Sequence, residues 1–227
     1  DEIDIIDIKD AKIDPDQFGY FINTEQGVTP VEVTLYGRSL DKIKNGDEVL
    51  TKNEDFKLGD LVDGKRVITL SKSYLNNQEP SEIKLTFNMN YGTDPELTVN
   101  IKDYDMSIDQ DFINEGNQDE FSFTLENAED GSTINYTISD GNSDTEDITG
   151  IVENVKVDED GNVQVAGIDV SGLDDGELTL KTTLIDEAGN EGEEKTNSVV
   201  KDIVYPALTV NDQVTNDKTP KITGETD

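Results

Sequence analysis

Hydrophobic and polar residues alternate along most of this chain. A period of two places every second side chain on the same face of a β-strand. The alternation predicts strands with one buried and one solvent-facing side at Val31–Leu35, Ile83–Met89, Leu97–Ile101, Phe121–Leu125, Ile134–Ile138 and Leu178–Leu184. No segment shows a sustained helical stripe, and only Ser71–Leu75, which opens with capping-type residues, predicts a short helical turn.

Residue pairs suited to tight turns separate these runs. Asn, Asp and Gly tolerate the positive φ of hairpin turns, so an Asn-Gly or Asp-Gly pair between alternating runs favours a hairpin. Such pairs occur at Asn45-Gly46, Asp63-Gly64, Asp130-Gly131, Asp160-Gly161 and Asp175-Gly176. Many short strands at this spacing predict an all-β chain built from antiparallel β-sandwiches.

The length of 227 residues suits two ordinary domains. One set of strands ends and an acidic stretch begins near Lys102–Asp105, and a second boundary lies near Lys201–Pro206. We therefore expect one sandwich over residues 1–102 and another over residues 103–206. Residues 207–227 are too few for a domain, so they are either the first strands of a third sandwich or a disordered tail.

The charge of the chain narrows the choice of partners. It has 52 Asp and Glu residues against 18 Lys and Arg, a formal net charge of −34. Such a surface repels the phosphates of nucleic acid and attracts cations, calcium above all. High net charge with only 33% hydrophobic residues is also a signature of disorder, but a disordered tail has no need of the regular alternation.

The absence of cysteine and histidine excludes several chemistries. Disulfides, thiolate nucleophiles, cysteine zinc sites, imidazole bases and the Ser-His-Asp triad all require one of these residues. The chain starts at Asp1 without methionine or an apolar signal core, and it has no stretch that could span a bilayer. We expect a monomeric piece of a longer polypeptide that does not insert into the membrane.

Several segments of the first half resemble a known family. They are Val33–Leu40, Ile43–Gly46, Leu50–Phe56, Val67–Leu75 and Ile83–Phe87. In order and spacing they are similar to the immunoglobulin-like accessory module that stands beside carbohydrate-binding modules in clostridial cellulases and cellulosomal scaffold proteins. The resemblance spans Val31 to Ile101 and implies an immunoglobulin-like sandwich. The role that it implies is that of a spacer, a solubilising module or a weak polysaccharide-attaching module, without catalysis.

The second half resembles another family, between Tyr104 and Pro206. The segments that carry this resemblance are Asp169–Leu180, Leu184–Asn190, Lys201-Asp202 and, after the boundary, Thr219–Gly224. They look like the immunoglobulin-like repeats of large bacterial surface proteins and repeats-in-toxin adhesins. This resemblance implies a tandem extracellular stalk on the bacterial surface, stiffened by calcium where one repeat meets the next.

Acidic residues at the expected boundaries are candidate calcium ligands. Calcium takes six to eight oxygen ligands from carboxylates, amides and backbone carbonyls. The first candidate cluster is Asp103, Asp105, Asp109 and Asp111, because alternate residues of an extended segment share a face. The alternative is a solvated acidic linker.

A second candidate cluster combines Asp186 and Asn190 with Asp202 and either Asp212 or Asp217. Gly189 lets this loop turn back so that oxygens point inward. The alternative is an ordinary hairpin turn in which Asp186 and Asn190 bond to the backbone. The segment Asp158–Asn162 begins like an EF-hand loop, but it lacks the glycine at position six and flanking helices, so a hairpin turn is favoured there.

Sugar binding usually employs exposed aromatic planes. Tryptophan is absent, which leaves Tyr20, Tyr36, Tyr74 and Tyr91 as candidates, although Tyr36 and Tyr74 are expected to be half-buried in the sandwich. Close carboxylate pairs of the kind that hydrolyse glycosides are inevitable among 52 acidic residues, and none lies in a recognisable pocket signature. We expect no catalysis.

Three functions remain open. The first is an extracellular stalk or spacer of a large bacterial surface protein, stiffened by calcium at its junctions. The alternative is a carbohydrate- or cell-wall-attaching module of a secreted polysaccharide-degrading enzyme. A third is a protein-binding adhesive domain that uses its loops as antibodies do, although the sequence shows no apolar loop patch. A polysaccharide or another surface protein is the expected partner, and nucleic acid is not.

Overall fold

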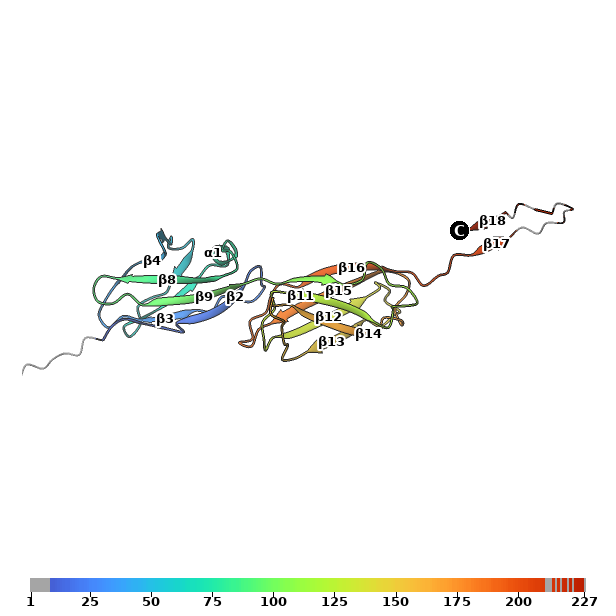
Figure 1. Ribbon diagram of the computed structural model, residues 1–227. Coiled ribbons are helices and arrows are strands. Elements are labelled where there is room, and N and C mark those ends of the chain that lie inside the picture. The colour runs from blue at the N-terminus through green and yellow to red at the C-terminus, as the bar shows by residue number, and fades with distance from the viewer. Residues whose placement is uncertain are drawn as a thin grey trace, which may run out of the picture.

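The computed structural model describes residues 9–210, 214, 216, 218–219, 221 and 223–226. Two β-modules follow one another along an elongated molecule, and a short strand pair lies beyond the second module (Figure 1). The prediction of an all-β chain is confirmed, because α1 (Lys72–Asn76) is the only α-helix among the described residues. No described helix is long and apolar enough to cross a membrane.

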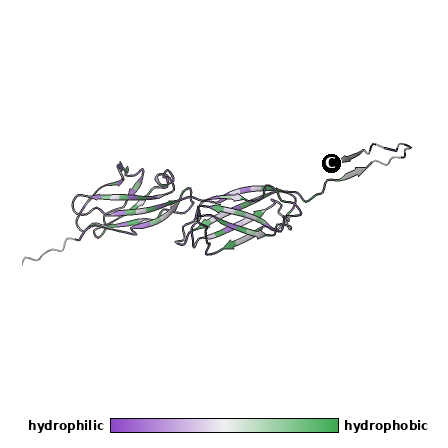
Figure 2. Ribbon diagram, viewed as in Figure 1, coloured by the Kyte–Doolittle hydropathy of each residue, from purple (hydrophilic) through white to green (hydrophobic). Residues whose placement is uncertain are grey.

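Two sheets face each other in the first module. One sheet has the strand order β1 (Lys12–Asp14), β3 (Val31–Thr34), β7 (Lys65–Leu70) and β6 (Phe56–Leu58). The other has the order β2 (Gln17–Phe21), β9 (Glu96–Lys102), β8 (Glu82–Met89), β4 (Leu40–Asn45) and β5 (Glu48–Val49). Hydrophobic and hydrophilic positions alternate along the strands, as the period-two pattern predicts (Figure 2).

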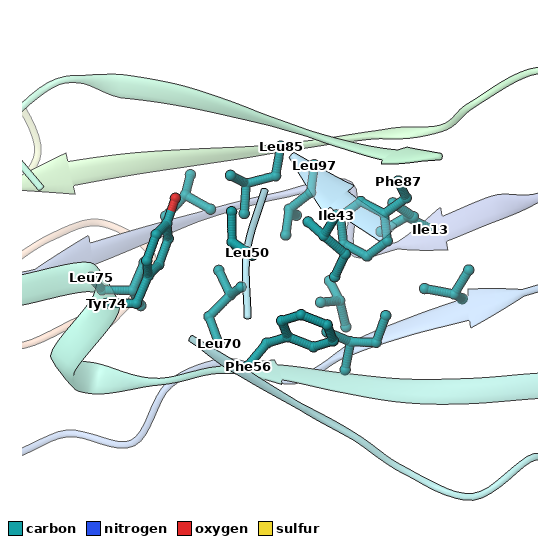
Figure 3. Close-up of a cluster of buried hydrophobic side chains, with 14 of the residues drawn as sticks. Ile13, Ile43, Leu50, Phe56, Leu70, Tyr74, Leu75, Leu85, Phe87 and Leu97 are labelled. Atoms are coloured by element: carbon teal, nitrogen blue, oxygen red, sulfur yellow. The ribbon is translucent and has the colours of Figure 1, made fainter. Parts of the chain in front are cut away.

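The inward faces of these sheets form one hydrophobic core. Side chains of Phe56 and Leu70 from one sheet meet Ile43, Leu85 and Leu97 from the other (Figure 3). All of these side chains are at most 5% exposed. Burying a side chain of this size stabilises the fold by about 1.5–3 kcal/mol, so the alternate apolar positions are what hold the two sheets together.

The predicted helical turn is α1, and Ser71 caps it. The Ser71 hydroxyl accepts a hydrogen bond from the Tyr74 backbone N–H, which satisfies one of the free donors of the first turn. Tyr74 and Leu75 are buried and close one end of the first core (Figure 3). The predicted Asn45-Gly46 turn joins β4 to β5, and Gly46 has the positive φ of 57° that such a turn requires.

One pairing departs from a purely antiparallel sandwich. Strand β2 runs parallel to β9, with Gln17 opposite Thr98 and Phe21 opposite Lys102. Both strands therefore end at the same edge of the first module, the edge that faces the second module (Figure 1). This pairing delivers Phe21, Lys102 and the residues after Phe21 to the junction.

The second module also has two sheets. The smaller has the order β10 (Asp105–Ile108), β11 (Phe121–Glu126) and β14 (Val163–Ile168). The larger has the order β13 (Ile148–Val152), β12 (Thr133–Ser139), β15 (Gly176–Ile185) and β16 (Lys195–Lys201), all antiparallel. Their inner faces bury the predicted alternate positions, among them Phe123, Leu125, Ile134 and Leu180.

Lys201 is an unusual member of this interior, at 1% exposure. Its ammonium donates to three backbone carbonyls, those of Val170 (3.0 Å), Ser171 (3.2 Å) and Leu173 (2.6 Å). A buried charge is tolerated only where polar partners replace water. Lys201 therefore holds the chain between β14 and β15 against β16.

Strands β17 (Leu208–Val210) and β18 (Gly224–Thr226) pair antiparallel beyond the second module (Figure 1). They lie where the sequence analysis expects the first strands of a third sandwich. The candidate ligands Asp212 and Asp217 lie outside the described residues.

Candidate functional site

Several hydrogen bonds and ion pairs join the two modules at their junction. Only Asp103 and Tyr104 separate the end of β9 from the start of β10. The loop of residues 186–191, which follows β15 and is here called the junction loop, faces the end of the first module. Three parts of the first module contact it: β2, the residues after β2, and Lys102.

Lys102 makes the charged contact of the junction. Its ammonium lies 2.7 Å from an Asp186 carboxylate oxygen and 2.6 Å from a Glu129 carboxylate oxygen. The Lys102 side chain is 14% exposed, Asp186 is 3% exposed and Glu129 is 49% exposed. The bond to Asp186 is therefore nearly buried, whereas the bond to Glu129 is open to solvent.

This environment perturbs both ionisable groups of the buried pair. Burial by itself raises the pKa of Asp186, but hydrogen bonds from Asn190 and Lys102 outweigh it, so the net pKa is lowered. Burial by itself lowers the pKa of Lys102, but its bonds to Asp186 and Glu129 leave the net pKa raised. Both groups are therefore charged at neutral pH.

Gly19 of β2 allows the junction loop to approach closely. A Cβ atom at Gly19 would lie 3.1 Å from the Asn190 side-chain nitrogen, 3.1 Å from an Asp186 carboxylate oxygen and 3.2 Å from Cε of Lys102. These separations are tighter than nearly all real Cβ contacts. A glycine here leaves room for the charged pair beside the strand.

The residues after β2 bond to the backbone of the junction loop. The Thr24 hydroxyl donates to the Glu191 carbonyl (2.5 Å), and the Glu191 N–H donates to the Gln26 side-chain oxygen (2.9 Å). Gln26 also donates to the Gly189 carbonyl (3.3 Å). Lys72 of α1 donates to the carbonyls of Thr24 and Glu25, both at 2.9 Å, and so anchors this segment to the first module.

Phe21 and Tyr104 supply the apolar part of the junction. Phe21 belongs to β2 of the first module, yet it packs in the hydrophobic core of the second module at 2% exposure. Its ring meets Tyr104 edge-on at 6.3 Å, and Lys102 lies 5.6 Å from the Phe21 ring centroid. The Tyr104 hydroxyl lies within hydrogen-bond distance of the Thr182 and Glu193 carbonyls, at 2.9 and 2.6 Å.

The first predicted calcium cluster is spread along β10. Asp103 pairs with Lys195 at 3.2 Å, and Asp109 accepts hydrogen bonds from Thr124 and Gln164, both at 2.8 Å. Asp105 is the first residue of β10 and Asp109 directly follows its last, so the two are about 13 Å apart at the usual rise per residue. Asp111 is exposed in the turn that follows.

A groove of about 610 Å³ beside Asp103 and Asp105 gathers further negative charge from Glu82, Glu126 and Glu129. Among the residues that the structure describes, no three carboxylates converge closely enough to hold a metal ion. As arranged, the first cluster does not present the six to eight convergent oxygens that calcium takes.

The second predicted cluster is divided between the two ends of the second module. Asp186 follows β15, whereas Asp202 follows Lys201, which pairs with Gly176 at the start of β15. A ten-residue strand separates them, about 30 Å at the usual rise. Asp202 accepts a hydrogen bond from the Val204 N–H instead.

Asp186 and Asn190 do meet, in the turn that the alternative interpretation describes. Asn190 donates its backbone N–H and its side-chain amide to the two Asp186 oxygens, both at 2.8 Å. With Lys102 as a third donor, this carboxylate is already neutralised and does not fit a calcium site as arranged. Asp158 accepts hydrogen bonds from the N–H groups of Asp160 and Asn162 in a tight turn. The strands on either side, β13 and β14, lie in different sheets, so the hairpin favoured at Asp158–Asn162 was wrong.

The four candidate tyrosines divide into two pairs. Tyr20 and Tyr74 are buried in the first core, at 3% and 5% exposure. Tyr36 and Tyr91 are 42% and 50% exposed, so the expectation that Tyr36 is half-buried in the sandwich was wrong. Tyr36 lies in the turn between β3 and β4 rather than on a strand of the sandwich.

Sequence reasoning did not assign Phe21, Lys102, Thr24 or Gln26 to the junction. Lys102 offered a weak signal, since it is a cation at the start of an acidic stretch on an expected boundary. Thr24 and Gln26 offered none, because their partners lie more than 160 residues away along the chain.

Comparisons with known proteins agree with this architecture. Residues 13–99 match the family model of the carbohydrate binding domain X2. A xyloglucanase from a Paenibacillus species is 31% identical over 97 residues, which are 42% of this chain and 9% of that protein. The chain thus spans about a tenth of the length of this curated relative.

Two solved structures show a low overall similarity to this chain. A tri-modular endo-β-1,4-glucanase of GH5 subfamily 4 from Bacillus licheniformis has a TM-score of 0.38 at 14% identity, over 85% of this chain and 38% of that chain. A tetra-tandem repeat from the extending region of a large adhesion protein has a TM-score of 0.37 at 13% identity, over 93% and 62% of the two chains.

The family match bears on catalysis as well as on fold. A carbohydrate-binding domain is an accessory module, so the expectation of a non-catalytic segment is confirmed. The first module is similar to the carbohydrate binding domain X2, as its resemblance to a cellulase accessory module predicts.

Proposed function

We propose that this chain is an extracellular spacer that holds other parts of a larger bacterial protein at a set distance and direction. The observation that carries the proposal is the junction, where Phe21 of the first module is packed into the core of the second. Two modules joined only by a flexible linker move independently. Here a two-residue connection, an apolar insertion and a nearly buried ion pair oppose that motion.

In this proposal the counter-charge at the junction is the Lys102 ammonium. A metal ion at the same place would have to displace Lys102 from Asp186. Calcium binding elsewhere on the acidic surface stays a prediction. A junction held by Lys102 and a junction held by calcium differ in their response to chelators. A lysine-based junction is indifferent to chelators, whereas a calcium-based junction is not.

The test is the distribution of distances between spin labels, one on each module, measured by pulsed electron resonance. We expect a narrow distribution for the wild type, unchanged by EDTA, and a broader one for the double variant Phe21→Ala, Lys102→Met. Lys84→Met is the matched control, because the Lys84 pair with Glu82 is exposed on both sides. A broad distance distribution for the wild type would refute the spacer. Broadening of the wild-type distribution on addition of EDTA would support a junction held by calcium.

A second candidate function is attachment to polysaccharide. The match of residues 13–99 to a carbohydrate-binding family favours it. A spacer and an attaching module are compatible roles, since a stiff segment that also touches the substrate would keep its neighbours close to it. Pull-down on insoluble cellulose, chitin and peptidoglycan tests this function, because a pure spacer binds none of them.

A further inference from the structure

Strand β13 forms an open edge of the second module (Figure 1). It is the last strand of the larger sheet and pairs only with β12 among the described residues. Within that part of the chain, no hydrogen bond joins residues 148–152 to anything other than β12. Alternate residues of an antiparallel strand turn their N–H and C=O groups away from the neighbouring strand, so β13 offers unpaired donors and acceptors along its outer side.

The other edge strands of the two modules are protected against further pairing. A sheet edge is commonly protected by a charged residue, by a bulge, by its short length or by a cover. Strand β5 has two residues, β14 carries a bulge between Val165 and Ile168, and β10 lies beside β16. The junction loop covers β2 at Gly19. The strands β1, β6 and β16 carry lysines: Lys12, Lys57 and Lys195.

Strand β13 has none of these features. Its five residues are all uncharged: Ile148, Thr149, Gly150, Ile151 and Val152. Ile151 is 68% exposed, and no register shift interrupts the pairing of β13 with β12. An uncharged, regular edge of this kind is a template for a further strand.

Tyr136 of β12 holds the middle of β13 in place. Glycine in the interior of a strand ordinarily weakens it, because it has no side chain to pack. Tyr136 lies opposite Gly150, and a Cβ atom at Gly150 would lie 2.2 Å from Cζ of Tyr136, so the ring occupies the space of the missing side chain. The same ring meets Phe123 edge-on at 5.4 Å. The edge is therefore formed before a partner arrives and loses little conformational entropy on binding.

The charges at the two ends of β13 distinguish between partners. Asp147 directly precedes the strand and Glu153 directly follows it, and both are exposed. A second copy paired antiparallel would set Asp147 against Glu153, and a second copy paired parallel would set like residues side by side. Like charges directly opposite each other destabilise a strand pair. A strand with basic residues at both ends would instead meet opposite charge, on a chain whose net charge is −34.

We propose that β13 is the docking site for an extended segment of a partner protein, which adds to the larger sheet as a further strand. The segment has an uncharged, β-branched centre that packs beside Ile151, and basic residues at each end that face Asp147 and Glu153. Backbone hydrogen bonds supply the affinity, and the side chains and end charges supply the specificity. This surface is independent of the spacer and of polysaccharide attachment.

Fluorescence anisotropy with synthetic peptides tests the edge on the 227-residue chain. The first peptide has a centre of alternating Val and Thr between lysine pairs, the second has glutamate pairs instead, and the third is the lysine peptide with proline in its centre. Proline removes a backbone donor and interrupts strand pairing. We expect the lysine peptide to bind at least about tenfold more tightly than the other two and to slow amide hydrogen exchange in β13.

Two results would overturn the proposal at this stage. Equal binding of the proline peptide would show that the attraction is that of charge alone. A lysine peptide that does not bind at all would show that the edge accepts no such strand.

Two single variants locate the binding. Ile151→Lys puts a cation on the edge and should weaken binding of the lysine peptide about fivefold, the factor that one lost cross-strand contact represents. Val200→Lys is the matched control on β16, the opposite edge of the same sheet, where the valine is 56% exposed. This control should bind as the wild type does, and equal affinities of the two variants would overturn the site.

The end charges have a control of their own. The double variant Asp147→Asn, Glu153→Gln should reduce the preference for the lysine peptide over the glutamate peptide. The double variant Asp47→Asn, Glu48→Gln removes two exposed carboxylates from the first module and should keep that preference. Equal preferences in the two double variants would overturn the proposed chemistry of the partner. A wild-type dimer in sedimentation that Ile151→Lys dissociates would assign the edge to a second copy and overturn the proposal.

Discussion

Replacement of Lys102 by methionine is the sharpest test of the junction. Methionine keeps an unbranched apolar stem and removes the ammonium that lies 2.7 Å from Asp186. Asp186 then remains as a 3% exposed carboxylate whose two donor groups both come from Asn190. The variant thus leaves a nearly buried negative charge without its cation.

The size of the effect follows from the exposure of each partner. Removal of one member of a buried ion pair costs about 3–5 kcal/mol. The bond to Glu129 adds only about 0–1 kcal/mol because Glu129 is 49% exposed. Asn190 continues to stabilise Asp186, so we expect about 2–3 kcal/mol of lost unfolding free energy. For a module of this size, that loss lowers Tm by roughly 10 °C or more.

A double-mutant cycle isolates the pair. Lys102→Met, Asp186→Asn and the double variant are unfolded with urea, and we expect a coupling free energy of about 1–2 kcal/mol. Lys84→Met is the control and should stay within about 0.5 kcal/mol of the wild type, because the Lys84–Glu82 pair is 60% and 54% exposed. Additive free energies in the cycle, or equal losses for Lys102→Met and Lys84→Met, would refute the argument.

The coupling also has a defined pH window. Since the pKa of Asp186 is lowered on folding, its contribution is present above the unfolded pKa of about 4 and is lost as the pH falls through the folded value. Since the pKa of Lys102 is raised, its contribution is present below the unfolded pKa of about 10.4 and is lost as the pH rises through the folded value. The coupling should therefore be constant between about pH 5 and pH 10.

Three further predictions concern the second module and the metal. Lys201→Met removes the ammonium donor of the Val170, Ser171 and Leu173 carbonyls and should lower the unfolding free energy by about 2–3 kcal/mol, because the Leu173 carbonyl is buried while the Val170 carbonyl keeps the Leu173 N–H as a donor. The exposed Lys181→Met should change it by less than about 0.5 kcal/mol, and equal losses would contradict the role of Lys201. Burial raises the pKa of Tyr104 to about 12, so stability should fall between about pH 10 and pH 12 in urea titrations. Tyr104→Phe should reduce that fall without removing it, because the pKa values of Lys102, Tyr20 and Tyr74 are also raised; an unchanged fall would contradict the role of Tyr104. Calcium at about 1 mM should leave the Tm difference between wild type and Lys102→Met unchanged, and a rescue of the variant by calcium would show that a metal can replace the ammonium.

Local signals in the sequence predicted six of the 18 strands among the described residues. The alternation at Ile83–Met89 and Phe121–Leu125 placed β8 and β11, because side chains on a strand face opposite sides in turn. Ser71 predicted α1 through its capping hydroxyl. The turn pairs Asn45-Gly46 and Asp63-Gly64 predicted hairpins through their tolerance of positive φ. The hairpins predicted at Asp130-Gly131, Asp160-Gly161 and Asp175-Gly176 were wrong, because each of these pairs joins strands of different sheets. Each of these signals depends on residues that are close along the chain.

The sequence by itself thus determined the all-β class, the short helix and the charge that disfavours nucleic acid. Tertiary structure decided how the modules meet. Only the parallel pairing of β2 with β9 brings Phe21 and Lys102 to one edge, and only the fold brings Asp186 within 2.7 Å of Lys102 across 84 residues. The sequence around an acidic residue does not indicate which cation will neutralise it, because the partner depends on distance and burial in the folded chain.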